Sequence, residues 1–338
     1  MNSTMKKSAL AAIAASALLC ALTQADAQQV RWRASGSFPA AHSTSVAMET
    51  FKKEVARLSN NTIQVDLFPN NTLGGAFEQV DQLRTGQIQM AWGGLSFYDK
   101  LAPEVGAATL PFAATSYKQA FCEIDSDFGR YMEATMADKG VLIIGWGNIG
   151  ARHVTNNKRP IKSVDDIKGL KIRTPSGEAW ELTFRALGAN PTPIDIKELY
   201  QALQQGVVDG QENPYDNMLV RKFNEVQKYL SNTGHFFDWS GYMVNKAAFE
   251  KLTPDQQNAV QRAMATAVAE QRAISERENK TAREGLIKGG MQYTELSPAE
   301  LEKFREATRP VYQQMRQKLG DKVMDLAEAA IKRCQSSQ

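Results

Sequence analysis

The sequence has few of the residues from which metal centres and disulfide scaffolds are built. It contains three cysteines in 338 residues, and its three histidines stand in no metal-ligand spacing such as H-E-x-x-H. Neither a C-x-x-C pair nor a G-x-S-x-G elbow occurs. We therefore expect no metal site and no cofactor. A Ser-His-Asp triad stays open, because it assembles in space and leaves no sequence pattern.

The chain also lacks a strong charge of one sign. Lysine and arginine together number 40 and aspartate and glutamate 37, which gives a net charge of +3. So small and scattered a surplus predicts no nucleic-acid partner. Hydrophobic residues at 43% and charged residues at 23% are typical of a globular protein. A chain of this length is expected to form about two folding units.

The N-terminus has the pattern of a secretory signal peptide. Lys6 and Lys7 precede an apolar run over residues 10–22, and Ala25 and Ala27 are small residues at −3 and −1 of a cut before Gln28. The run is shorter than the about 20 apolar residues that a transmembrane helix needs. We therefore expect residues 1–27 to be removed and the mature protein to be exported.

Two cysteines remain after that cut, Cys122 and Cys334. An exported protein allows them to form one disulfide, but their wide separation in the sequence leaves the pairing open. The third, Cys20, lies in the apolar run and follows the bulky Leu19, which disfavours a lipid anchor there.

Strand-like and helix-like segments alternate along the mature chain. Ile63, Val65 and Leu67 alternate with polar residues and predict a strand over 62–68, whereas residues 43–58 have the apolar spacing of a helix. A continuous apolar run at 141–144 predicts a buried strand, and a further short strand is expected near 151–155. This alternation is typical of an α/β protein whose sheets are covered on both faces.

One helix is expected to be very long. Thr253 and Pro254 are a cap residue and a proline at the first helical position, and the pattern continues to about Ile287. At 1.5 Å per residue such a helix is about 50 Å long, which exceeds a small domain, so we expect it to run across two lobes. No flexible linker separates the lobes. We expect lobe I to contain residues 28–150 and 239–278, and lobe II residues 151–238 and 279–338.

The run Gly145–Gly150 matches the G-x-G-x-x-G dinucleotide fingerprint, but its surroundings do not fit. The fingerprint requires a helix to begin there and an acidic residue about 20 positions on. Instead, residues 151–155 favour a strand, and Leu170 stands where the acid is expected. We interpret the glycine run as a bend where the chain crosses between lobes.

Two arginines stand at predicted strand ends, where ligand groups collect in α/β proteins. Arg173 ends the segment Gly169–Arg173, and Arg152 follows the glycine run. Asn213 also ends a predicted strand and offers both a donor and an acceptor. A guanidinium presents a planar fork that holds a carboxylate by two parallel hydrogen bonds, so the pattern favours an anionic ligand.

These segments resemble the DctP family, the periplasmic solute-binding proteins of TRAP transporters. The likeness covers essentially the whole mature chain in order. Its most specific motif begins at Asp166 and includes Gly-Leu-Lys-Ile-Arg-Thr-Pro at 169–175. Further family-like segments are Phe68–Gly74, Leu110–Phe112, Pro191–Pro193 and Glu198–Pro214.

The resemblance implies a periplasmic binding protein fold of two α/β lobes, joined by hinge strands and a long helix, that closes on an organic acid. The family's clamp arginine, which holds the ligand carboxylate, falls on Arg173, and a second ligand arginine falls on Arg152. The pocket asparagine falls on Asn213, and Ser176 and Ser37 are expected near the ligand. Implied partners are a small carboxylate and the TRAP membrane permease subunits. We expect a monomer in the periplasm without catalytic activity.

The ligand is left open within the organic acids. Sialate-binding members carry a glutamate and an arginine where this chain has Gly94 and Phe97, which disfavours sialate. Sugar acids and uronates, C4-dicarboxylates, and aromatic or 2-oxo acids remain candidates. Trp92, Phe97, Tyr215 and Trp239 are candidate pocket walls, with core packing as the alternative for each. The alternatives to transport are a periplasmic enzyme acting on an organic acid and a sensor subunit.

Overall fold

The computed structural model describes residues 29–336, and the expected signal peptide with its cut before Gln28 lies outside that range. The described chain alternates strands and helices, as the sequence predicts. The strands are β1 (Val30–Gly36), β2 (Ile63–Phe68), β3 (Met90–Gly94), β4 (Val141–Asn156), β5 (Lys171–Thr174), β6 (Asn190–Pro193), β7 (Gly210–Asn213), β8 (Tyr229–Asn245) and β9 (Gln292–Thr294).

Helices make up most of the rest of the described chain. The α-helices are α2 (Ser43–Leu58), α3 (Ala76–Thr85), α4 (Tyr117–Ile124), α5 (Asp127–Asp138), α6 (Glu178–Ala186), α7 (Leu199–Gln204), α8 (Tyr215–Val220), α9 (Lys246–Glu250), α10 (Pro254–Lys288), α11 (Pro298–Leu319) and α12 (Asp321–Gln335). Short 3-10 helices are η1 (Leu95–Tyr98), η2 (Pro103–Ala108), η3 (Val164–Ile167) and η4 (Phe223–Glu225).

The strands form one sheet in the order β2-β1-β3-β8-β4-β7-β5-β6, with β9 paired to β8. One end of the sheet, β2-β1-β3, belongs to the first lobe, and the other end, β7-β5-β6, belongs to the second. The parallel pairs β1–β2, β1–β3, β5–β6 and β5–β7 lie within the lobes. The long antiparallel strands β4 and β8 pair with each other through both lobes. This arrangement confirms the expected two-lobe α/β fold with hinge strands.

The glycine run 145–150 lies inside β4, so two expected strands are one bent strand. The pairing of β4 with β8 shifts register at three points, between Ile143 and Gly145, Asn148 and Gly150, and Arg152 and Val154. Such shifts are bulges, which bend a strand and increase its twist. Gly150 has φ of +119°, and a Cβ there would lie 2.9 Å from Asn279 Nδ2. The run therefore serves the crossing between lobes and not a nucleotide.

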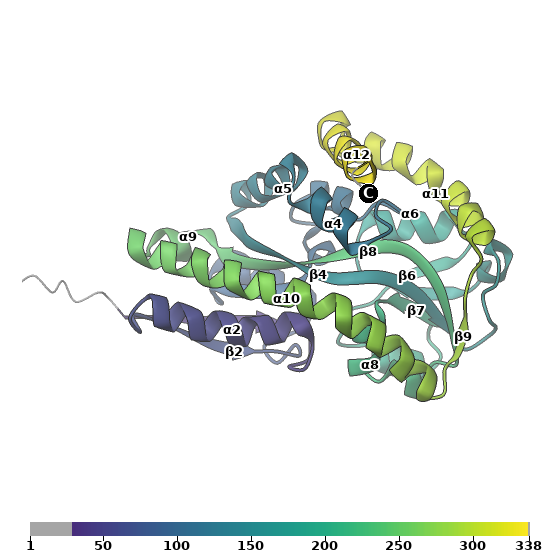
Figure 1. Ribbon diagram of the computed structural model, residues 1–338, viewed down its shortest axis with the longest axis horizontal. Helices are drawn as coiled ribbons and strands as arrows, with labels where there is room; N and C mark the ends of the chain where they lie inside the picture. The colour runs from purple at the N-terminus through teal and green to yellow at the C-terminus, as the bar shows by residue number, and fades with distance from the viewer. Residues whose placement is uncertain (1–28, 337–338) are drawn as a thin grey trace, which may run out of the picture.

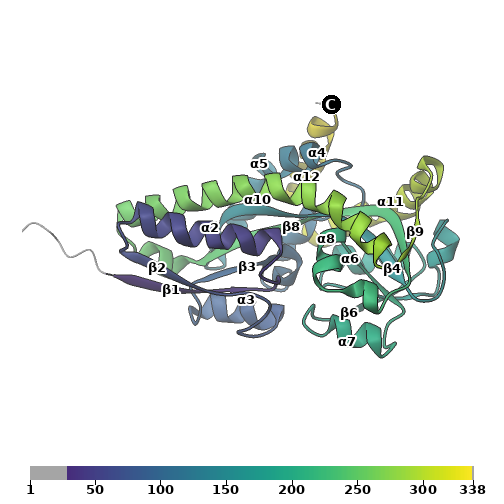
Figure 2. The same cartoon turned by 60° about the horizontal axis from the view of Figure 1, so that its bottom comes forward.

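The long helix α10 joins the two lobes on one side of the sheet. It begins where Thr253 and Gln256 cap each other's backbone and runs for 35 residues. It packs against α2 and β4 in the first lobe and against α8 in the second, and Figure 1 shows it lying along both lobes. In the first lobe α2 and α10 cover one face of the strands and α3 lies on the other (Figure 2).

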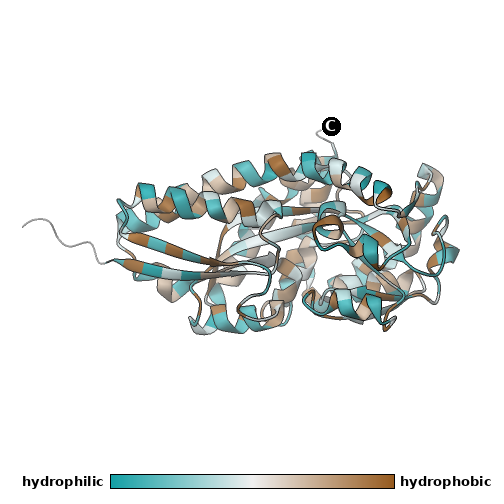
Figure 3. Cartoon of the chain, turned by 90° about the horizontal axis from the view of Figure 1, so that it is seen from below, coloured by the Kyte–Doolittle hydropathy of each residue, from teal (hydrophilic) through white to brown (hydrophobic). Residues whose placement is uncertain are grey.

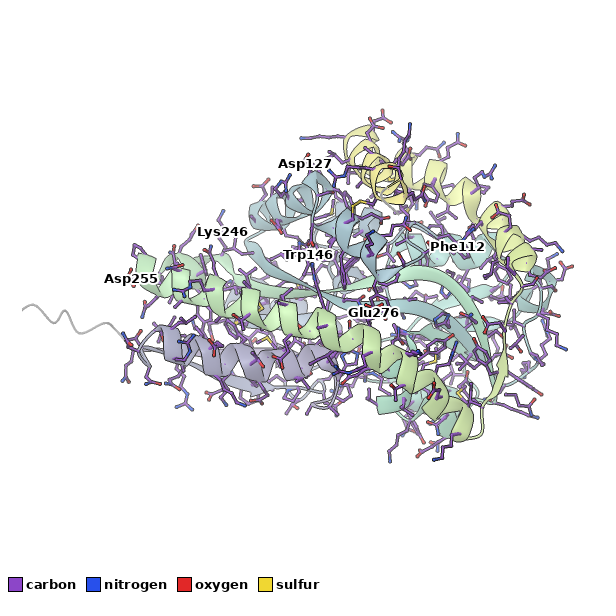
Figure 4. All side chains as sticks on the ribbon, viewed as in Figure 1. Phe112, Asp127, Trp146, Lys246, Asp255 and Glu276 are labelled. Atoms are coloured by element: carbon purple, nitrogen blue, oxygen red, sulfur yellow. A yellow bond between two sulfur atoms is a disulfide. The ribbon has the colours of Figure 1, made fainter. Side chains whose placement is uncertain are left out.

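The core follows the alternation seen in the sequence. Hydrophilic and hydrophobic residues alternate along β1 and β2 (Figure 3). Their inward side chains, among them Trp32, Ile63 and Val65, pack with Met48 and Phe51 of α2. Trp146, labelled in Figure 4, lies where β4 passes between α5 and α10: its Nε1 donates to Glu133 Oε1 of α5. In the described residues no helix is long and apolar enough to cross a membrane.

The C-terminal helices, which lie within residues 279–338 that we expect in lobe II, pack against elements of both lobes. Helix α11 packs against α6 of the second lobe, but α12 packs against α4 and α5 of the first. A disulfide between Cys122 of α4 and Cys334 of α12 fixes this position. Buried apolar residues of α12, among them Val323 and Met324, complete the contact. The disulfide that the sequence left open is thus formed.

The disulfide joins residues 212 positions apart, so it restricts the unfolded chain strongly. We expect the double variant Cys122→Ala/Cys334→Ala to lower the free energy of unfolding by about 2–5 kcal/mol, measured by urea denaturation. Reduced wild type should match the variant, and reductant should leave the variant unchanged. A variant as stable as the oxidised protein would contradict the prediction.

Candidate functional site

A pocket lies between the two lobes, where strands of both lobes end. The carboxyl ends of β1 and β3 reach it from the first lobe and those of β5 and β7 from the second, which is where α/β sheets bind ligands. Its atom-free space, counted together with the open solvent at its mouth, is about 340 Å³. Its lining is Ser37, Phe38, Gly94, Ser96, Phe97, Ile149, Arg152, Arg173, Pro175, Ile196, Asn213, Asn217, Arg221 and Asp238.

Arg173 is a buried cation without a carboxylate partner. The residue is 1% exposed and extends from β5 into the pocket lining. Its Nε donates to the carbonyl oxygen of Ile194 at 2.8 Å, while its Nη2 has no hydrogen-bond partner. Burial lowers the pKa of Arg173 to about 9, and the carboxylate of Glu212 opposes that shift. At neutral pH the guanidinium is charged, so it offers free donors to an anion.

Arg152 is the opposite case, because its donors are occupied. Its Nε and Nη2 donate to the carboxylate of Glu212 at 2.5 and 2.7 Å, and its Nη1 donates to Asp238 Oδ2 at 2.7 Å. Nη2 also reaches Asn213 Oδ1 at 3.1 Å. Burial by itself would lower the pKa of Arg152, but the two carboxylates outweigh it and raise the pKa. Arg152 therefore lines the pocket as the centre of a buried ion-pair cluster.

Three further residues named from the sequence lie in the pocket lining: Ser37, Phe97 and Asn213. Asn213 is 2% exposed, and its Oδ1 accepts from Asn217 Nδ2 at 2.7 Å. Phe97 is part of the apolar wall and packs edge-on against Phe77. These residues add neutral polar groups and an apolar side to the pocket in which Arg173 has a free donor.

The other three aromatic candidates lie outside the lining of the interlobe pocket and pack in the protein core instead. Trp92 is 1% exposed beneath α2, where its Nε1 donates to Ser45 Oγ. Tyr215 stacks on His153 with ring centroids 4.0 Å apart and lines a different cavity beside α10. Trp239 lines a third cavity, between α5 and α12.

Arg221 and Asp238 are pocket residues that sequence reasoning did not identify. Arg221 follows α8, and its Nη2 donates to the carbonyl oxygen of Ser37 at 2.6 Å, across the lobes. Its Nε donates to Asn217 Oδ1 at 2.7 Å, and burial lowers its pKa to about 10. The one available signal was proximity in sequence, since Arg221 follows the Asn213 segment and Asp238 precedes Trp239.

Hydrogen bonds between the lobes close the pocket. Ser176, which the sequence placed near the ligand, lies outside the lining and donates from Oγ to the carbonyl oxygen of Ser96 at 3.0 Å. Two carboxylates accept backbone N–H groups at helix starts of the opposite lobe. Asp99 Oδ2 accepts from Glu178 N at 3.0 Å, beginning α6, and Asp195 Oδ2 accepts from Phe77 N at 3.3 Å, in α3. The structure is therefore a closed form.

The pocket holds no arrangement typical of a metal centre. Within residues 29–336 no group of three or more His, Cys, Asp and Glu side chains is placed to hold a metal ion. The buried His235 instead contacts Glu212, with 3.2 Å between Nε2 and Oε2.

Comparison with known proteins shows the family of the chain. The family model for bacterial extracellular solute-binding protein, family 7 (DctP), matches residues 34–319. The C4-dicarboxylate-binding periplasmic protein DctP of Rhodobacter capsulatus is 29% identical, covering 83% of this chain and 84% of that protein.

Solved structures share the same fold. The sugar acid binding protein DctPAm of Advenella mimigardefordensis, in complex with galactonate, has a TM-score of 0.88 and 29% identity, covering 91% of this chain and 99% of that one. A TRAP periplasmic solute-binding protein of Sulfurospirillum deleyianum with bound succinate has a TM-score of 0.85 and 27% identity, covering 90% and 99%. The chain therefore belongs to the DctP family of bacterial extracellular solute-binding proteins, the binding subunits of TRAP transporters.

Proposed function

We propose that this protein captures a small organic acid by its carboxylate on Arg173, between closed lobes, and delivers it to the membrane permease of a TRAP transporter. The observation that carries the proposal is the free Nη2 of a buried guanidinium in the interlobe pocket. The solved relatives with galactonate and succinate support a carboxylate ligand. The signal-like N-terminus supports export to the periplasm, with cleavage near Ala27.

Electrostatics explains why the ligand is an anion. A charge removed from water is costly unless an opposite charge and hydrogen bonds replace the water. Arg152 has such partners within the protein, but Arg173 has only the carbonyl oxygen of Ile194. A ligand carboxylate provides both the missing charge and acceptors for the planar fork. An uncharged ligand would leave the buried charge of Arg173 without a counter-charge, so the pocket selects for acids.

Closure follows from the placement of the binding groups on both lobes. Arg173 and Asn213 come from the second lobe, and Ser37 and Phe97 come from the first. A ligand that touches both sets binds the closed form better than the open form, so it shifts the equilibrium between them. Release to a permease then requires the interlobe hydrogen bonds to break. Capture and release in this order change no covalent bond of the ligand.

The experiment for this function is a thermal-shift screen of the exported protein against sugar acids, uronates, C4-dicarboxylates, and aromatic and 2-oxo acids. We expect at least one acid to raise the melting temperature and to bind in calorimetry. Chromatography of each mixture after incubation separates transport from the enzymatic alternative, because a binding protein returns the acid unchanged. Conversion of an acid into a product would refute the binding role.

Arg173→Met should remove high-affinity binding of whichever acid the screen identifies. The methionine keeps much of the arginine's volume but loses its charge and donors, so we expect the dissociation constant to rise at least about 100-fold in calorimetry. Arg185→Met is the matched control, because Arg185 is an exposed arginine of α6 paired with Glu181. Near-wild-type affinity in Arg173→Met would falsify the assignment.

Arg152→Met should lower the stability of the unliganded protein, since it removes the partner of two buried carboxylates. Glu212 and Asp238 would be left without that cation, and breaking a buried ion pair in this way costs about 3–5 kcal/mol. We expect urea denaturation of the unliganded protein to show this loss for Arg152→Met and a much smaller change for Arg173→Met. Equal losses in the two variants would contradict the separate roles.

A further inference from the structure

The pocket contains a carboxylate as well as the free cation. Asp238, on β8, is 2% exposed and lines the same pocket as Arg173. Its Oδ2 accepts from Arg152 Nη1 at 2.7 Å, and its Oδ1 accepts from the backbone N–H of Trp239 at 2.8 Å. Each carboxylate oxygen has two lone pairs, so both oxygens can accept one more hydrogen bond. An ionised carboxylate has no hydrogen to donate.

The hydrogen-bonding capacity of Asp238 determines what part of a ligand it tolerates. A hydroxyl group donates a hydrogen bond to it, and this satisfies both groups in a buried space. A ligand carboxylate is itself an acceptor without a hydrogen, so it would place two negative groups together without a donor between them. The end of the ligand at Asp238 therefore carries hydroxyl groups.

The charges around the pocket lead to the same conclusion. The lining has three cations, Arg152, Arg173 and Arg221, and one anion, Asp238. Glu212 adds a second anion directly on Arg152, so these five groups carry at most one surplus positive charge. Asp195, outside the lining, also acts on Arg173 and Arg221 and reduces that surplus, so a single ligand carboxylate is enough to neutralise it. A second carboxylate would leave a net negative charge inside the closed lobes, where screening by solvent is weak.

We infer that Asp238 makes this protein selective for hydroxylated monocarboxylates, such as sugar acids, over dicarboxylates. The inference rests on the proposed function, because it assumes that Arg173 holds the one ligand carboxylate. It narrows the range left open by the relatives, whose ligands include both galactonate and succinate. Asp238 acts here as the residue that distinguishes a terminal hydroxymethyl group from a terminal carboxylate.

Matched pairs of acids test the inference on the wild-type protein. D-erythronate and meso-tartrate differ only in a terminal CH₂OH or COO⁻ group, and the same is true of D-galactonate and galactarate. We expect calorimetry at neutral pH to compare the two acids of each pair. In the pair whose monoacid binds better, the monoacid should bind at least about tenfold more tightly than its diacid. Succinate, a diacid without hydroxyl groups, should bind no better than meso-tartrate.

A variant then assigns the selectivity to the residue. Asp238→Asn removes the negative charge but keeps an oxygen for Arg152, so the ratio of diacid to monoacid dissociation constants should fall at least about fivefold. The matched control is Asp125→Asn, which removes a carboxylate from the exposed ion pair with Arg272 and should leave the ratio unchanged.

The possible failures can be told apart. Diacids that bind as tightly as their monoacids, or an unchanged ratio in Asp238→Asn, overturn the selectivity and leave carboxylate capture by Arg173 standing. A wild-type protein that binds no carboxylic acid of either kind overturns the proposed function and this inference together.

Discussion

The organisation of the site depends on an imbalance of charge, because the pocket holds more buried guanidinium groups than carboxylates. Arg152 and Arg173 lie in the same pocket and are both almost fully buried. The chain gives Arg152 two carboxylates and gives Arg173 a backbone carbonyl. Arg152 thus stabilises the cluster in which it lies, whereas Arg173 remains available to an anion from outside. The difference lies in the partners, because the residue type is the same.

In the proposed function, the imbalance can be maintained because the hinge lets the pocket open to water. Two long strands and one helix cross between the lobes, and the contacts between the lobes beside the pocket include single hydrogen bonds such as those of Ser176 and Arg221. Single hydrogen bonds each contribute little net free energy, so they can be exchanged for water during opening. The glycine run in β4 gives the crossing strand its bend. The strands that form the hinge therefore also carry residues of the charged pocket.

Some of the site was predictable because it depends on local sequence. The motif ending at Arg173 predicted a strand end with an arginine facing a cleft, and Asn213 followed from the same reasoning. Other positions depend on which way a side chain points once long strands have bent. Trp239 turns away from the pocket while its neighbour Asp238 faces it, and register shifts in β4 and β8 cannot be read from one sequence. Arg221 enters the site because a helix end of one lobe meets Ser37 of the other.

The sequence by itself determined the fold class, the long helix from Thr253, the family and the presence of Arg173 at a strand end, since each rests on a local pattern of residues. The tertiary structure decided the fate of Arg152 and the position of α12. It also decided that Cys122 and Cys334 are bonded. The physical reason is distance along the chain: the carboxylates that occupy Arg152 come from positions 60 and 86 residues away. Only the folded arrangement of β4, β7 and β8 brings those charges together, and so only folding leaves Arg173 without a carboxylate partner.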